Sequence, residues 1–529
     1  MAVYTKQDAA GLQMSGVFRH PFRDRYQDFG SECGPYDDAA LSANVRNMCA
    51  LSAAIRAKVS WRTKAQNPII RARWREEAIS APVPYGDAQL TEYEVDYVLN
   101  ELAWHASRKD EETGIEASVF SRIWQSDRLV NDALRNELLR VVARLEDIPE
   151  DQRDWHPHTD HQVLDLVHPS LYCIVYDQTV LRAGYDPRPL PSASPFEDAC
   201  EDTRGLFRSD LFSWLPTDFA VSEDGTTAKA LCYINNLSPY THASAYPVME
   251  RLVARFVPLW ERVLSESRAG REMRPLPGWN HSFDENDADG SVQLKGRTLQ
   301  VIIKLANILL TPEKPEYAGG SWHVEGMVNE AIVSTGIYYY DEENITESSL
   351  AFRMAVSAPE DYEQFDYDGV KAEFGFTIDE PLNQQIGSVV TKQGRCIAFP
   401  NVFQHQVQPF ELADKSKPGH RKIVALFLVD PELPKPRPST TNILPQQAGW
   451  MKLVLRDVAA KLRAVHGADA KGFGALPVEV IDMIVDQAEW LMSRQEAEEH
   501  RLALMDERTA MTGVNDECMF SMAFNMCEH

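Results

Sequence analysis

Two side chains with the chemistry of metal ligands, His323 and Glu325, stand two positions apart at the start of a segment rich in β-branched and aromatic residues. Because alternate side chains of a β-strand share a face, a strand here would point the imidazole and the carboxylate the same way. One imidazole nitrogen and one carboxylate oxygen make up two thirds of the 2-His-1-carboxylate facial triad, which holds Fe(II) and leaves coordination positions open. Since short motifs such as His-x-Glu often arise by chance, the prediction needs a third ligand.

His405 is the predicted third ligand. It opens the second of two short predicted strands joined by a Pro-Asn turn, and the chain between it and His323 is long enough for several strands. A polar loop follows, after which Arg421 stands at the start of the apolar run 422–429. The order of these residues on predicted strands favours metal binding over a set of unrelated polar side chains.

Short runs of strand character, separated by polar turns, surround these residues. They cover residues 299–310, 321–327, 331–340, 350–356, 388–391, 395–399, 405–410 and 421–429. Eight short strands suit a double-sheet jelly roll. The open end of such a fold is a natural place for a small-cofactor pocket.

The sequence from Lys304 to Met327 resembles a large family catalogued only as a domain of unknown function, whose members are regarded as Fe(II)/2-oxoglutarate-dependent oxygenases. The stretches 165–171 and 233–239 resemble the same family, so the resemblance covers roughly residues 90–450. His-x-Glu, a distal His and an Arg at the head of the last core strand are also similar to the general motif of such oxygenases. Glu325 departs from the commonest pattern, which has the shorter Asp.

The resemblance implies an α+β protein with a double-stranded β-helix core, of jelly-roll or cupin type. It implies that His323, Glu325 and His405 ligate Fe(II), and that Arg421 binds the distal carboxylate of 2-oxoglutarate. A guanidinium suits that role because its planar fork forms a bidentate, charge-assisted pair with a carboxylate. Arg353, on the predicted strand 350–356, is a rival anchor, and Lys304 is a further basic residue that can face the same pocket.

The expected function is that of a non-haem iron, 2-oxoglutarate-dependent dioxygenase acting on a small-molecule or amino-acid-like substrate with O2. Two alternatives stay open. A cupin-type iron dioxygenase or oxidase would keep the triad and bind its substrate directly to the metal, without 2-oxoglutarate. A catalytically silent jelly roll would only bind a small molecule. The sequence identifies neither the substrate nor the type of oxidation.

The 529 residues are expected to form three parts: a mainly helical region over 1–290, the catalytic core over 291–432 and a helical extension over 433–529. Helices are predicted at 39–56, 91–107, 130–145 and 245–267 before the core, where they would cover it, and at 450–465 and 478–506 after it. The last helix would wrap the core or pair with another subunit, which makes a homo-oligomer possible.

The formal net charge of −26 argues against a nucleic-acid partner, because affinity for the phosphate backbone depends on cations. The sequence holds no apolar run long enough for a membrane span. The eight cysteines are scattered without a Cys-x-x-Cys pair, which is typical of a reduced, cytoplasmic protein.

Two further stretches imitate metal sites. The first holds His156, His158, Asp160 and His161 within six residues, but it precedes the predicted strands of the core, and a surface loop is the preferred interpretation. The second, residues 284–290, imitates a calcium loop. Its alignment would put Gly296 where a bidentate Glu belongs, so a turn is predicted there instead.

Overall fold

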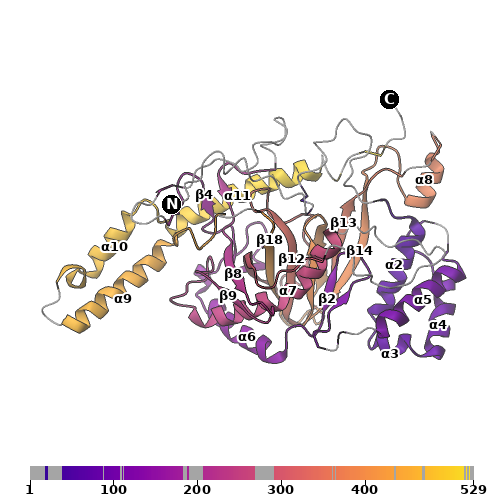
Figure 1. Cartoon of the computed structure of the whole chain (residues 1–529), viewed down its shortest axis with the longest axis horizontal. Coiled ribbons are helices and arrows are strands. Elements are labelled where there is room, and N and C mark those ends of the chain that lie inside the picture. Colours follow the sequence, from indigo (N-terminus) through magenta and orange to yellow (C-terminus); the bar gives the residue numbers. More distant parts are fainter. Residues whose placement is uncertain are drawn as a thin grey trace.

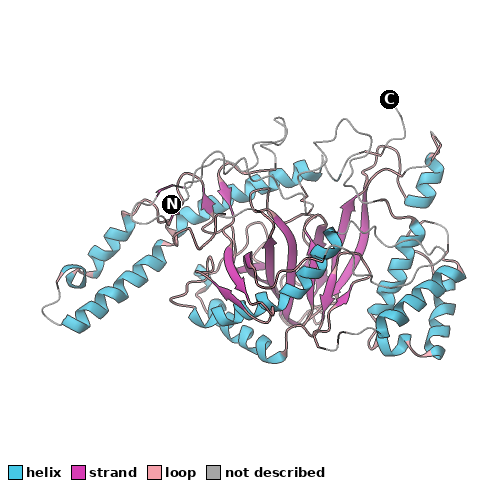
Figure 2. Ribbon diagram, in the orientation of Figure 1, coloured by secondary structure: helices cyan, strands magenta, loops and turns pink. Residues whose placement is uncertain are grey.

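A computed structural model describes residues 18, 20–21, 39–86, 89–107, 110, 112–182, 188–189, 207–268, 291–359, 362–363, 365–433, 437–466, 471–516, 520 and 523–524. The predicted turn at 284–290 lies outside these residues. Figure 2 shows a β-sheet core between helical parts, in agreement with the predicted α+β class. None of the described helices combines the length and the apolar character that a membrane crossing requires.

The central sheet has nine strands in the order β1-β2-β15-β12-β18-β10-β8-β9, with β3 also paired to β10. Its core strands are β10 (Thr298–Leu310), β12 (Ile332–Glu343), β15 (Cys396–Pro400) and β18 (Gly419–Val429). All of its pairings are antiparallel. These four strands correspond to the predicted strands 299–310, 331–340, 395–399 and 421–429.

A second sheet, in the order β14-β13-β16, faces the first. It consists of β13 (Ser348–Ala355), β14 (Asn383–Thr391) and β16 (Gln404–Val407), and an isolated bridge between His323 and His405 adds a fourth chain segment beside β16. Along the sequence the chain alternates between the two sheets, except that β13 and β14 follow each other within the second sheet. This arrangement is a double-stranded β-helix, and it confirms the predicted fold class.

The two faces of the central sheet have different partners, as β18 shows. Val424, Leu426 and Leu428 pack in one apolar cluster with helix α7 (Tyr246–Arg268), whereas Ala425 and Phe427 belong to the cluster between the two sheets. This alternation follows from the two-residue period of a strand. We call the second side, which faces the other sheet, the inner face.

Helix α7 (Tyr246–Arg268) lies close against the outer side of the sheet (Figure 1). A Cβ atom on Gly336 of β12 would lie 2.5 Å from Cδ1 of Phe256 on this helix, closer than atoms can approach. Glycine at this position therefore lets the helix pack directly on the strand. The predicted helix at 245–267 and its role as a cover of the sheet are confirmed.

The region before residue 290 supplies strands to the same sheet as well as helices. β2 (Trp124–Ser126) pairs with β15, and β3 (Val163–Val167) and β8 (Thr217–Val221) pair with β10. The sheet thus runs across the division that the sequence predicted at residue 290. The shorter strands are β1 (Glu116–Ala117), β4 (Ile174–Val175), β5 (Val180–Leu181), β6 (Arg188–Pro189), β7 (Phe212–Ser213), β9 (Ala228–Ala230), β11 (Glu316–Tyr317) and β17 (Phe410–Glu411).

The N-terminal helices form a bundle beside the sheets, with an apolar core of their own (Figure 1). They are α2 (Ala43–Arg56), α3 (Trp61–Ala65), α4 (Pro68–Ser80) and α5 (Glu92–Ser107). Two other helices are α6 (Asp132–Glu146) and α8 (Tyr367–Phe374). Those predicted at 39–56, 91–107 and 130–145 are confirmed within a few residues.

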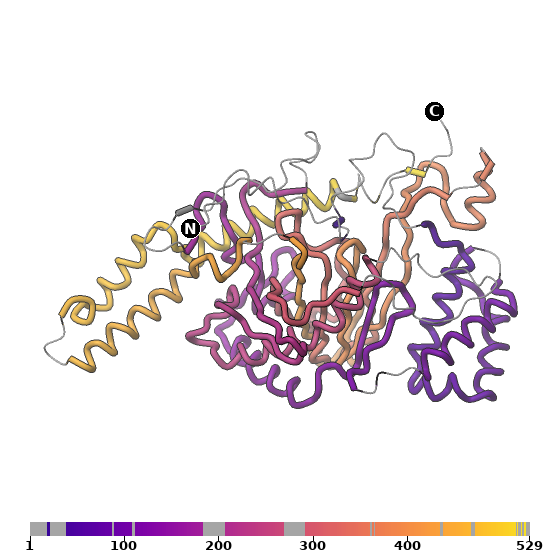
Figure 3. Tube along the Cα trace, in the orientation of Figure 1, coloured from indigo at the N-terminus to yellow at the C-terminus, as the bar shows by residue number. Residues whose placement is uncertain are grey.

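The C-terminal extension has two parts. Helices α9 (Ala448–His466) and α10 (Val478–Asp486) project from the body as an arm (Figure 3). Helix α11 (Arg494–Asn515) runs back along the body. The prediction of one helix over 478–506 is wrong, because the chain turns after Asp486 and a new helix starts at Ser493, whose side chain forms a capping box with Glu496.

Candidate metal centre

The structure brings the three predicted ligands together. The ligand atoms of His323, Glu325 and His405 all lie within 4.8 Å of one another. Oε1 of Glu325 lies 3.7 Å from Nε2 of His323 and 3.5 Å from Nε2 of His405. Two imidazole nitrogens and one carboxylate oxygen thus converge on one point, as a facial triad requires.

Backbone hydrogen bonds hold the two histidines side by side. The N–H of His323 donates to the carbonyl of His405 over 3.2 Å, and the N–H of His405 donates to the carbonyl of His323 over 3.0 Å. His405 is anchored in turn by β16, where it pairs with Phe352 of β13. His405 therefore belongs to the second sheet, and the β-bridge holds His323 beside it.

The strand predicted over 321–327 is wrong, because only His323 of this segment makes a β-bridge. The segment turns instead at Gly326, whose φ of +71° suits glycine. Glu325 is held by Asn401: its N–H donates to Oδ1 of Asn401, and Nδ2 of Asn401 donates to its carbonyl, both over 2.8 Å. The shared direction of the imidazole and the carboxylate therefore comes from these contacts and not from strand geometry.

The tautomer of His323 suits a metal ligand. Its Nδ1 lies 2.8 Å from the carbonyl oxygen of Ser321, which can only accept a hydrogen bond. Nδ1 therefore carries the proton, and the lone pair of Nε2 is left for a metal. The side chain of His323 is 34% exposed, against 4% for His405, so solvent reaches the site from the side of His323.

The electrostatics of the triad favour an ionised carboxylate. Burial alone would raise the pKa of Glu325, but the neighbouring imidazoles of His323 and His405 hold that pKa well below its usual range. Burial and the neighbouring His323 lower the pKa of His405, which favours the neutral imidazole. An ionised carboxylate and a neutral imidazole are the forms that bind metal ions.

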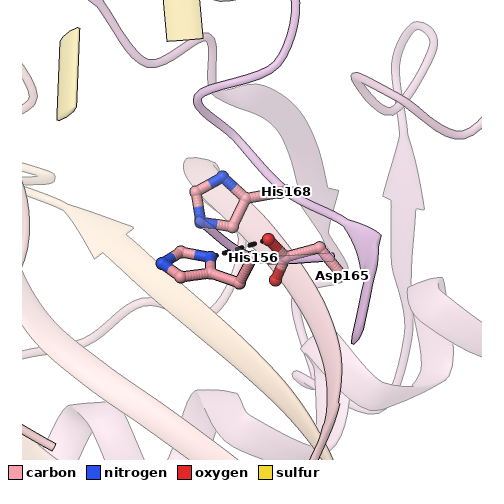
Figure 4. A group of neighbouring side chains, drawn as sticks. All are labelled: His156, Asp165 and His168. Atoms are coloured by element: carbon pink, nitrogen blue, oxygen red, sulfur yellow. Dashed lines mark hydrogen bonds and ion pairs between the residues drawn. The ribbon is translucent and has the colours of Figure 1, made fainter. Parts of the chain in front are cut away.

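A second cluster has the same composition. His156, Asp165 and His168 point toward one another (Figure 4), and their ligand atoms also lie within 4.8 Å. Here, however, Nδ1 of His168 accepts a hydrogen bond from the N–H of Ser170 over 3.2 Å. In the neutral imidazole, Nε2 then carries the proton and has no lone pair for a metal.

The partners of Asp165 give the second cluster a different character. Oδ2 of Asp165 accepts hydrogen bonds from Nδ1 of His156, over 2.7 Å, and from the guanidinium of Arg501 on α11. Arg501 also donates to Asp154 over 2.6 Å. The cluster is therefore a buried hydrogen-bond network that docks α11, and we do not assign it a metal.

The surface loop predicted around residue 158 is found, with one exception. His158, Asp160 and His161 are exposed and have a left-handed backbone conformation. His156 instead turns inward to Asp165, which the sequence analysis missed. The available signal was a charged residue inside the apolar run 163–167, since a buried carboxylate needs hydrogen-bonding partners.

Arg421 lies on the inner face of β18 and is fully buried. Its guanidinium lies 4.6 Å from the ring centre of Phe410 and 5.4 Å from that of Tyr339. It donates to Oγ of Ser348 and lies 3.5 Å from a carboxylate oxygen of Glu342. Arg421 thus places a buried guanidinium near the start of the predicted strand 421–429.

Arg353 has other partners. It donates to Gln404 and, over 2.8 Å, to Asp516 just beyond α11, and its guanidinium lies 4.9 Å from the ring centre of Trp322. Its neighbours in sequence, Phe352 and Met354, belong to the cluster between the sheets. In a strand this puts Arg353 on the opposite side, so it links the second sheet to the C-terminal extension.

Arg508 of α11 is a residue near the site that the sequence analysis missed. Its guanidinium stacks 3.7 Å from the ring centre of Trp214 and donates to Glu330 over 2.7 Å. Burial lowers the pKa of Arg508, while Glu330 and the candidate ligand Glu325 act in the opposite direction. Because sequence periodicity does not reveal which charges meet across the fold, no local pattern could have found this contact.

The fold and the site define a double-stranded β-helix protein with a candidate 2-His-1-carboxylate metal centre. The sequence model of a family described as "Protein of unknown function (DUF4246)" matches residues 92–293 and 280–453, and the chain belongs to this family. The predicted resemblance is thereby confirmed. No curated protein sequence matches the chain.

Several solved structures resemble the chain weakly. TqaL, described as an Fe(II)/α-ketoglutarate-dependent dioxygenase, has 9% identity and a TM-score of 0.23, with 60% of this chain and 98% of TqaL covered. The rice dioxygenase for auxin oxidation has 11% identity and a TM-score of 0.25, with 59% and 74% covered. AviO1 from Streptomyces viridochromogenes Tue57 has 13% identity and a TM-score of 0.23, with 60% and 92% covered.

Proposed function

We propose that this protein is a non-haem iron oxygenase that uses 2-oxoglutarate and O2 to oxidise a small molecule. The observation that carries the proposal is the convergence of His323, Glu325 and His405, together with the tautomer that leaves Nε2 of His323 free. The ionised carboxylate of Glu325 and the neutral imidazole of His405 support the same proposal. Iron with 2-oxoglutarate would supply the oxidation of a C–H bond.

The chain's own residues would bind and orient the reactants. His323, Glu325 and His405 would hold Fe(II), and Asn401 would keep Glu325 in place through its two backbone contacts. Arg421 would bind the distal carboxylate of 2-oxoglutarate. Glu342 is a weak competitor for Arg421, since burial raises the pKa of Glu342 and its contact with Arg421 is 3.5 Å long.

The test is an anaerobic titration of the Fe(II)-loaded protein with 2-oxoglutarate. Chelation of the keto acid should produce a saturable visible charge-transfer band. His405→Ala and His323→Ala should bind no iron and show no band, while their far-ultraviolet circular dichroism stays unchanged. Iron-dependent turnover that survives His323→Ala would disprove the ligand assignment.

The anchor is tested by a matched pair of arginine variants. Arg421→Ala should raise the dissociation constant of 2-oxoglutarate by at least ~tenfold, because a buried charge pair contributes more than ~1.4 kcal/mol. Arg353→Ala should leave that constant nearly unchanged, since Asp516 and Gln404 already engage Arg353. Equal effects in the two variants would contradict the assignment of Arg421.

One observation favours a second candidate, the cupin-type iron oxygenase without 2-oxoglutarate. Arg421 already donates to Ser348, so its guanidinium has a hydrogen-bond partner within the protein and does not need the carboxylate of 2-oxoglutarate. This candidate predicts that iron binds and that O2 is consumed with substrate, but that 2-oxoglutarate produces neither a band nor succinate.

A further inference from the structure

Lys304 is a cation on the inner face of β10 that forms no ion pair with any carboxylate of the described residues. Its neighbour two positions before, Ile302, belongs to the cluster between the sheets, so the lysine side chain faces the same way. The residue is half-buried. Within the described part of the chain, Lys304 makes no hydrogen bond and no ion pair, although removing an ammonium group from water without a partner is costly.

The surroundings of Lys304 connect it to the metal centre. His405 lies opposite Phe352 in the second sheet, and Phe352 and Ile302 belong to the same cluster between the sheets, so His405 and Lys304 face one interior. On the neighbouring strand β3, Asp165 lies opposite Ala306 and already accepts from His156 and Arg501. Lys304 therefore faces the interior that holds the triad, near a carboxylate that has other partners.

Three arginines of this region have carboxylate partners. Arg501 donates to Asp165, Arg508 donates to Glu330 and Arg353 donates to Asp516. The chain has 79 acidic residues against 53 lysines and arginines, so a carboxylate partner for Lys304 was readily available. The unpaired ammonium near the metal centre therefore favours an anionic ligand from outside the chain.

A single keto acid does not account for both Lys304 and Arg421. Lys304 pairs with Ala425, and Ile308 pairs with Arg421, so the two cations are four residues apart along the sheet. At about 3.3 Å per residue their backbones are ~13 Å apart. A 2-oxoglutarate molecule that is chelated at one end has one distal carboxylate, so it can neutralise only one of the two.

We propose that Lys304 binds a carboxylate of the substrate to be oxidised, so that the substrate is a small carboxylic acid or amino acid. This assignment rests on the proposed function, because it takes Arg421 as the anchor of 2-oxoglutarate. A single ammonium matches the single charge of a carboxylate, whereas phosphate sites usually combine arginines or several backbone N–H groups. The carboxylate on Lys304 would fix the substrate's orientation, with its reacting carbon at the triad.

The first arm of the test separates the two sources of a carboxylate. Lys304→Met keeps the length of the side chain and removes the charge, and Lys304→Arg restores the charge. In the anaerobic band titration, Lys304→Met should change the dissociation constant of 2-oxoglutarate by less than ~threefold, against at least ~tenfold for Arg421→Ala. If Lys304→Met weakens 2-oxoglutarate as much as Arg421→Ala does, Lys304 is the keto-acid anchor and the proposal falls.

The second arm requires neither iron nor turnover. Lys304 is acetylated with an amine-reactive reagent and quantified by mass spectrometry, with exposed Lys58 as the internal control. The probes are small carboxylic acids and amino acids, each compared with its primary amide. At least one acid should slow the acetylation of Lys304 by ~fivefold or more while its amide does not, because only the acid carries the charge that an ammonium binds. Lys58 should be unaffected throughout.

The outcomes of the two arms are distinct. Three results would overturn the assignment of Lys304. They are protection of Lys304 from acetylation by 2-oxoglutarate alone, protection by the amides as well as the acids, and no protection by any acid. In the iron-loaded protein, the acid that protects should also perturb the 2-oxoglutarate band of wild type and of Lys304→Arg, but not that of Lys304→Met. Absence of the band in wild type would instead count against the proposed function, while the acetylation result would still report on Lys304.

Discussion

At the residue scale, hydrogen bonds distinguish two clusters of the same composition. His323 presents Nε2 because Ser321 accepts from its Nδ1, whereas His168 uses its Nδ1 lone pair to accept from Ser170. In both clusters the three ligand atoms lie within 4.8 Å of one another. The donor set alone is therefore not enough to identify a metal site, since the atom that bonds each imidazole decides which nitrogen is available.

Asn401 provides a prediction at this scale. Asn401→Ala removes both contacts that hold Glu325 and should lower the affinity for Fe(II) by ~10–100-fold, the usual effect of losing a group that orients a ligand. It should also destabilise the fold by ~1–3 kcal/mol, because buried backbone groups lose their partner. Metal titration and urea denaturation measure the two effects. Unchanged iron affinity would show that the His-x-Glu segment is held by other contacts.

At the element scale, close packing and buried ion pairs join the helices to the sheets. Helix α7 depends on the missing side chain of Gly336, and α11 depends on arginines that reach buried carboxylates. The two kinds of contact fail in different ways. Added volume in a packed interface forces side chains to shift, whereas a lost ion-pair partner leaves a charge buried without compensation.

Gly336→Ala tests the first contact. The new Cβ would lie 2.5 Å from Phe256, so the ring or the helix must move, and a loss of ~1–3 kcal/mol in unfolding free energy is expected. The matched control is Gly449→Ala on α9, where a Cβ would meet nothing within 4 Å. Alanine there should be neutral or stabilising, because glycine is unfavourable in a helix. Urea denaturation compares the two variants.

Arg501→Ala tests the second contact. It leaves Asp165 buried without its guanidinium and should lower the free energy of unfolding by ~3–5 kcal/mol.

Burial would raise the pKa of Asp165, but His168, His156 and Lys304 hold that pKa far below its usual range. Since the folded-state pKa is lowered, the stabilisation from Asp165 is present above its unfolded pKa of ~3.9 and is lost as the pH falls below that value.

Urea denaturation of wild type and Asp165→Asn between about pH 3 and pH 6 measures this dependence. Wild type should lose stability more steeply toward the acid end than Asp165→Asn, which cannot titrate at this position. Parallel curves would mean that Asp165 does not contribute to the acid sensitivity of the protein.

At the scale of the whole molecule, α9 and α10 form an arm that projects from the body (Figure 3). Val480, Met483 and Ile484 share one face of α10 and are 37%, 59% and 47% exposed. Val458, Leu462 and Val465 form a similar stripe on α9. Exposed apolar surface of this kind marks an interaction site, and the homo-oligomer expected from the C-terminal helices stays a prediction.

Light scattering after size-exclusion chromatography tests that prediction. Wild type should run as an oligomer, and Met483→Glu with Ile484→Glu should shift it to a monomer, because buried charges oppose association through an apolar face. The triad lies on another part of the chain, so iron binding should be retained. A monomeric wild type at tens of micromolar would contradict the prediction.

The amino-acid sequence by itself determined the elements and the chemical types at the candidate site. Strand and helix periodicity is a local property of the sequence. For this reason it predicted the core strands and the helices that correspond to α2, α5, α6, α7 and α9. The order of the triad residues followed from the same pattern. The exceptions were also local in origin. The segment 321–327 turns at Gly326, and the predicted C-terminal helix is interrupted before the capping box at Ser493.

Only the tertiary structure decided which polar groups meet. The approach of α11 and the pairing of Arg353 with Asp516 depend on contacts between distant parts of the chain. The tautomer of His323 and the inward turn of His156 depend on shorter-range contacts with Ser321 and Asp165 that only the folded chain forms. Such contacts are set by the register of the sheets and the docking of helices. Neither leaves a periodic signal in the sequence, because charge pairing depends on distance in space and not on spacing along the chain.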